Sequence, residues 1–166
     1  NNYICSGVPD GGVISHRFHN PVGINMFFMI LNIGEVRKKY DVNNVKNSVY
    51  GEDLKKYSPI ALIKRNYEYK PDYHNTIEHG YMPFGVIYDN FEPYYCFFFW
   101  LLRNNFKILY LDANEHIDNI TTIVKNQNGV EFAYHTWYAR RWSREYTQRN
   151  RIVNVINHCN KIKLNG

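Results

Sequence analysis

The feature of this sequence that most constrains its fold is the stretch of 32 residues at 135–166, where basic and aromatic side chains are interleaved. Aromatic and aliphatic residues recur there at intervals of four, four, seven and three positions, which places them on one side of a helix. We therefore expect an amphipathic helix over 139–157 with a buried apolar side. That side would carry Tyr138, Trp142, Tyr146, Val153 and Ile156.

The charge of the same stretch indicates an anionic partner. It holds five arginines and two lysines against one acidic residue, Glu145, and it accounts for the whole net charge of +5. Arginine can pair with phosphate and stack on a base, and aromatic rings offer further stacking surfaces. We predict RNA binding, by the protein alone or as a subunit of a larger assembly. The predicted nucleic-acid-binding residues are Arg140, Arg141, Arg144, Arg149, Arg151, Trp137 and Tyr138.

Other partners fit the same charge pattern. An acidic protein or an anionic membrane surface would also neutralise the arginines, and a solvated basic face would need no partner. A tyrosine-rich surface that packs against further copies of the chain is a third, structural interpretation. These alternatives stay open at the level of the sequence.

Length and composition predict the fold class. A chain of 166 residues suits one compact domain, and an aromatic content of 17% supplies much buried area per residue. We predict an α+β fold with a single domain over 1–166. A mixed sheet of central and C-terminal strands would accompany the basic C-terminal helix, and Asn128 with Gly129 would form a tight turn. Strands are expected at 13–18, 60–63, 85–88, 95–101, 107–111 and 130–138, helices at 24–33, around 52–57 and from Asp112 or Asn114 to 125, and a long loop at 66–80.

Cysteine usage and hydropathy bear on the compartment. Cys5, Cys96 and Cys159 are far apart and form no CxxC pair, which favours the cytoplasm or another reducing compartment. One disulfide plus one free thiol is the secreted alternative. No apolar run approaches the roughly 20 residues of a membrane span, and no signal peptide is visible in the sequence.

Histidines and carboxylates elsewhere suggest a second function class. Histidine titrates near neutrality, so it can pair with a carboxylate in acid–base catalysis. The alternative to RNA binding is therefore a small hydrolase or transferase acting on a phosphorylated substrate. The spacing of these residues matches no standard zinc motif, so we predict no metal site, and the sequence leaves any cofactor unknown. The candidate catalytic residues are His16, His19, His74, Glu78, Asp112 and His135.

Overall fold

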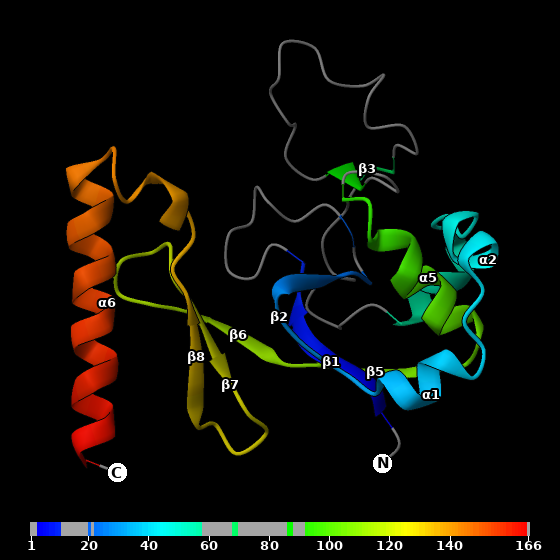
Figure 1. The fold of residues 1–166 in the computed structure, drawn as a ribbon, viewed down its shortest axis with the longest axis horizontal. Coiled ribbons are helices and arrows are strands. Elements are labelled where there is room, and N and C mark those ends of the chain that lie inside the picture. Colours follow the sequence, from blue (N-terminus) through cyan, green and yellow to red (C-terminus); the bar gives the residue numbers. More distant parts are fainter. Residues whose placement is uncertain are drawn as a thin grey trace. The chain divides into compact units, whose positions relative to one another are not determined.

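The chain has an α+β fold, as the composition predicts (Figure 1). The computed structural model describes residues 3–10, 20, 22–57, 68–69, 86–87 and 92–165. The chain divides into two compact units, Asn1–Leu111 (unit 1) and Asp112–Gly166 (unit 2). Each unit is described by itself below, and the single domain over 1–166 stays a prediction.

Unit 1 contains a three-stranded mixed sheet. Its central strand β1 (Tyr3–Pro9) pairs antiparallel with β2 (Ile24–Leu31) and parallel with β5 (Lys107–Tyr110). A separate two-residue parallel pair joins β3 (Glu68–Tyr69) to β4 (Val86–Ile87). The mixed sheet thus consists of N-terminal strands plus β5, which corrects the expectation that C-terminal strands belong to it.

Short helices follow β2 in the chain. They are α1 (Ile33–Arg37), α2 (Val42–Lys46) and the 3-10 helix η2 (Glu52–Tyr57), which confirms the short helix expected around 52–57. Asn32 and Asp41 cap α1 and α2, since each side-chain oxygen accepts a hydrogen bond from a backbone N–H three residues later. The caps explain why such short helices begin where they do.

Two expectations for unit 1 were wrong, because continuous apolar runs carry no periodicity that separates a strand from a helix. Residues 24–31 form the strand β2, and the expected strand at 95–101 is the helix α5 (Tyr95–Arg103). Six of the nine residues of α5 are buried, so most of its circumference is covered. A helix that is buried on several sides reads as a uniformly apolar run.

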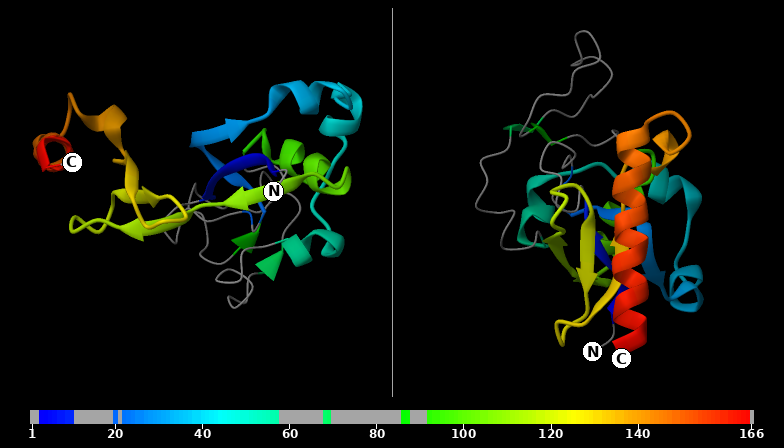
Figure 2. Two further views of the ribbon diagram at one scale, coloured as in Figure 1. Left: turned by 90° about the horizontal axis from the view of Figure 1, so that it is seen from below. Right: turned by 90° about the vertical axis from the view of Figure 1, so that its left-hand side faces the viewer.

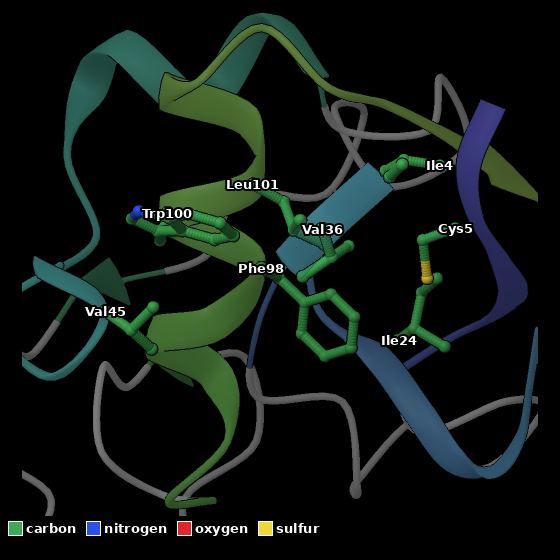
Figure 3. Close-up of a cluster of buried hydrophobic side chains, with 8 residues drawn as sticks. All are labelled: Ile4, Cys5, Ile24, Val36, Val45, Phe98, Trp100 and Leu101. Atoms are coloured by element: carbon green, nitrogen blue, oxygen red, sulfur yellow. The ribbon is translucent and has the colours of Figure 1, made fainter. Parts of the chain in front are cut away.

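The core of unit 1 forms around α5. In Figure 3, Phe98 and Leu101 leave α5 on the side of Cys5 and Ile24, whereas Trp100 leaves it on another side. A second cluster packs against the same helix and includes Leu54 of η2. The first cluster consists of Ile4, Cys5, Ile24, Val36, Val45, Phe98, Trp100 and Leu101. The second consists of Val22, Tyr50, Leu54, Tyr95, Phe99 and Leu102.

Unit 2 contains an antiparallel sheet and the longest helix described. The strands β6 (Asp112–Glu115), β7 (Thr122–Lys125) and β8 (Glu131–His135) pair in that order. The 3-10 helix η3 (Ala139–Arg141) and the helix α6 (Tyr146–Asn165) follow, and Figure 2 shows α6 from its end and from its side. The strand β5 confirms the prediction at 107–111, and β8 confirms the first part of the strand predicted at 130–138 but ends at His135.

The connections of this sheet include one confirmed turn and one correction. Gly129, at a φ of 76°, lies in the turn between β7 and β8, as the Asn–Gly pair predicts. The helix expected from Asp112 or Asn114 to 125 is instead the β6–β7 hairpin. The Asp118 carboxylate accepts hydrogen bonds from the backbone N–H groups of Ile120 and Thr121, so it stabilises the hairpin connection rather than a helix.

The buried position of Phe98 predicts a large effect of truncation. Replacing Phe98 by Ala should lower the free energy of unfolding by about 3–5 kcal/mol, because a fully buried ring leaves a cavity. The matched control is Ile30→Ala on β2, whose side chain is 60% exposed. The control should change the free energy by no more than about 0.5 kcal/mol. Urea unfolding followed by circular dichroism measures both, and equal losses would contradict this core.

Candidate nucleic-acid interface

Three of the five arginines of unit 2 lie before α6 rather than along it. The helix expected over 139–157 was wrong in its first part, because the chain forms η3 and turns before α6 begins at Tyr146. Residues 138–149, which we call the basic aromatic segment, therefore span η3, a turn and the first turn of α6. Its cationic and aromatic members are Tyr138, Arg140, Arg141, Trp142, Arg144, Tyr146 and Arg149.

Two guanidinium groups of this segment are available to a ligand. The side chains of Arg140 and Arg144 are exposed and make no hydrogen bond or ion pair with any residue that the structure describes. Arg141 is engaged instead, with Nη1 3.2 Å from a Glu145 carboxylate oxygen and its guanidinium 5.2 Å from the centre of the Tyr138 ring. An exposed ion pair of this kind contributes little to stability, so it can exchange partners.

Two aromatic residues of this segment face outward, Trp142 in the turn before α6 and Tyr146 at the first position of α6. Trp142 is 38% exposed and Tyr146 is 72% exposed, although their spacing predicted burial. Among the residues of α6 whose side chains are described, Ile152 and Val155 are buried. Nε of Arg149 donates a hydrogen bond to the Trp142 carbonyl at 3.4 Å. This bond holds the Arg149 guanidinium beside the turn. Exposed rings and cations thus occur together.

Arg151 was predicted to contact nucleic acid, but the structure places it inside unit 2. Its side chain is 11% exposed. Nη1 donates to Asp118 Oδ2 at 3.0 Å and to Thr121 Oγ1 at 2.8 Å. Nη2 donates to the carbonyls of Thr136 and Trp137, and Nε donates to Gln148. A guanidinium has five N–H donors, and these five hydrogen bonds use all of them.

Trp137 was also predicted to contact nucleic acid, and its side chain is likewise buried inside unit 2. It is 8% exposed, and its indole Nε1 donates to Thr122 Oγ1 at 3.0 Å. The ring therefore lies in the interior of unit 2 and is not a surface for stacking. Trp137 and Tyr138 have φ angles of 28° and 57°, a backbone region that costs residues with side chains roughly 1–3 kcal/mol each. Surrounding contacts must hold this conformation.

The surroundings of Asp118, the partner of Arg151, lower the pKa of its carboxyl group. Burial alone would raise the pKa of Asp118, but hydrogen bonds from Thr121, Ile120 and Arg151 outweigh that effect and hold the pKa well below its usual range. Asp118 is therefore ionised at neutral pH. Only 11% and 13% of the side-chain areas of Arg151 and Asp118 are exposed, so the ion pair is largely buried and loss of either partner is costly.

The residues predicted for a catalytic site are mostly not described. His16, His19, His74 and Glu78 lie outside the described residues. Asp112 is exposed at the start of β6, and His135 ends β8, where its ring centre lies 4.1 Å from that of Trp137. The hydrolase or transferase alternative therefore stays a prediction.

A cluster that the sequence did not indicate joins α6 to the sheet. The rings of His116, Tyr134 and His158 meet edge to face, with centres 5.6–6.4 Å apart. The Tyr134 hydroxyl donates to Glu131, and burial together with this carboxylate raises the pKa of Tyr134. These ring contacts join residues 18 to 42 positions apart, so no local spacing could have revealed them.

Cysteines and metal ligands add no further site within the described residues. None of Cys5, Cys96 and Cys159 forms a disulfide, and burial raises the pKa of Cys5 to about 12, which makes it a poor nucleophile. The part of the chain that is described contains no group of three or more His, Cys, Asp or Glu side chains able to hold a metal ion. None of its helices is both long and apolar enough to cross a membrane.

Comparison of the chain with protein-family models, with curated proteins and with solved structures gives no match. The function must therefore be argued from the geometry of unit 2.

The largely buried pair of Asp118 and Arg151 predicts a stability that depends on pH. The folded-state pKa of Asp118 is lowered, so its contribution is complete above the unfolded-state pKa of about 3.9 and is lost as the pH falls below it. At pH 7, Asp118→Asn should lower the free energy of unfolding by about 3 kcal/mol. The difference from wild type should shrink in acid. Urea titrations at several pH values measure it.

The matched control is Glu145→Gln, which removes the carboxylate of the exposed ion pair with Arg141 in the same unit. It should change the free energy of unfolding by less than about 1 kcal/mol at any pH. An Asp118→Asn effect as small as that of the control would contradict a stabilising buried pair.

Proposed function

We propose that unit 2 binds RNA through the basic aromatic segment. The observation that carries the proposal is the pair of exposed guanidinium groups of Arg140 and Arg144, which lack internal partners among the described residues, next to the exposed rings of Trp142 and Tyr146. A solvated basic face is ordinarily balanced by nearby acids, whereas this segment contains a single acid, Glu145, that pairs with Arg141.

Charge supports a polyanion as the ligand. Cations without internal partners lose no ion pair when they meet phosphate, and each phosphate that they neutralise releases a condensed counterion. Arg149, whose Nε donates to the Trp142 carbonyl, adds a further positive charge from the first turn of α6. The arginine fork also suits phosphate, because two N–H groups can donate to two oxygens at once.

The exposed rings support single-stranded RNA in particular. Bases of a single strand are free to stack on aromatic side chains, and such stacking tolerates any base sequence. Tyr146, at 72% exposure, and Trp142 replace Trp137 as the residues best placed for stacking. The proposal therefore keeps Arg140, Arg141, Arg144 and Arg149, with Tyr138 beneath Arg141, and leaves out Arg151 and Trp137.

Removing the charges of Arg140 and Arg144 should weaken RNA binding and reduce the dependence of that binding on salt. In a variant with Arg140→Gln and Arg144→Gln, the slope of log affinity against log salt should fall by roughly 1.4, about 0.7 for each lost phosphate contact with a single strand. Fluorescence anisotropy of a labelled single-stranded RNA across a salt series measures the slope.

The matched control removes the same charge from unit 1, by Arg37→Gln and Lys46→Gln, both exposed on short helices. It should leave the slope close to that of wild type. If wild type binds no RNA at low salt, or if both double variants lose binding equally, the segment is not an RNA-binding site. Binding of an acidic protein to the same residues would then be the better proposal.

The ring of Tyr146 should contribute through stacking. Tyr146→Ala should weaken binding of single-stranded RNA by about 1–3 kcal/mol, whereas Tyr146→Phe keeps the ring and should bind within about twofold of wild type. Anisotropy at one fixed salt concentration compares the two variants. Equal losses in both would point to the hydroxyl group and contradict stacking. Duplex RNA, whose bases are already stacked, should show little difference between them.

A further inference from the structure

Arg151 connects three parts of unit 2 that are distant in the sequence. Its acceptors are the β6–β7 connection, through Asp118 and Thr121, and the chain that leaves β8, through the carbonyls of Thr136 and Trp137. The arginine itself belongs to the second turn of α6. One side chain therefore joins the sheet, the helix and the start of the basic aromatic segment.

Arg151 donates to the backbone at Trp137, where the chain has a strained, left-handed conformation. The Trp137 carbonyl accepts from Nη2 at 2.6 Å, and Trp137 and Tyr138 are the two consecutive residues with left-handed φ angles. Such a conformation persists in bulky residues only where neighbouring contacts over-determine it. It turns the chain out of β8 so that η3 and the following turn present Arg140 and Arg144 at the surface.

We infer that Arg151, held by Asp118, is a positioning residue for the basic aromatic segment rather than a contact for the ligand. Only the RNA-binding test of this inference rests on the proposed function. All five N–H donors of Arg151 are used inside unit 2, so none is left for phosphate. A lysine would keep the charge but could not make the forked set of hydrogen bonds.

Two substitutions separate positioning from contact. Arg151→Lys keeps the positive charge, so a phosphate contact would survive it, whereas positioning would not. Asp118→Asn removes a negative charge from unit 2, which by simple electrostatics should tighten RNA binding. If Asp118 positions the segment through Arg151, the same substitution should weaken binding instead. The opposite signs make Asp118→Asn the decisive variant.

A matched control accounts for general loss of stability. Val155→Ala truncates a buried side chain of the same helix, one turn beyond Arg151, without removing any hydrogen bond to the segment. The full-length chain is used throughout, at a temperature where circular dichroism shows every variant to be folded. If Arg151→Lys fails to fold, Asp118→Asn and the control suffice.

The first readout needs no RNA. Trypsin cuts after arginine, and Arg140, Arg141 and Arg144 lie in the segment itself. Mass spectrometry then gives the rate at which fragments cut after these three residues appear. We expect Arg151→Lys and Asp118→Asn to raise this rate about tenfold over Val155→Ala, because local opening follows from the loss of buried charged hydrogen bonds. Unchanged rates in both would overturn the inference.

The second readout is the affinity for labelled single-stranded RNA at fixed salt. We expect both variants to bind about tenfold more weakly than wild type, and Val155→Ala to bind like wild type. Wild-type or tighter binding by Asp118→Asn would overturn the inference. If wild type itself binds no RNA, the proposed function fails, and the cleavage rates alone decide whether Arg151 positions the segment.

Discussion

Unit 2 depends on the guanidinium of Arg151 and the carboxylate of Asp118. A charge removed from water must be fully paired and hydrogen-bonded, and here every donor of the arginine has an acceptor. Four of the five acceptors come from residues 14 to 33 positions away in the chain. The pair therefore specifies which segments of unit 2 meet and in which orientation. Apolar packing alone specifies this less strictly, because it is not directional.

Unit 1 is organised differently, around the aromatic helix α5. Its buried side chains pack against the sheet on one side and against Leu54 and Tyr50 on another. Polar contacts then fix the ends of this helix. The Tyr95 hydroxyl donates to the buried Asp10 carboxylate at 2.6 Å, and Arg103 at the other end donates to Asp53 and to the Val49 carbonyl. Burial of apolar side chains stabilises unit 1, and these hydrogen bonds fix the orientation of α5.

The basic C-terminal stretch thus serves two purposes with one residue type. Arg151 is satisfied inside unit 2 and leaves its charge out of any external contact, while Arg140 and Arg144 remain at the surface without internal partners among the described residues. The RNA-binding proposal depends on this division, because only exposed cations can release counterions on meeting phosphate. The rings of Trp142 and Tyr146 lie in the same segment and give it a second means of binding.

The sequence by itself determined the α+β class, the strands at 107–110 and 131–135, the turn at Gly129 and the location of the excess charge, because local propensity and composition decide these properties. It could not separate strand β2 from helix α5, since both are apolar runs that burial accommodates in either conformation. Nor could it tell which arginine is internal or which side of α6 is buried. Only the tertiary structure decided those points, because a buried cation or ring needs acceptors and neighbours that distant segments supply when the chain folds.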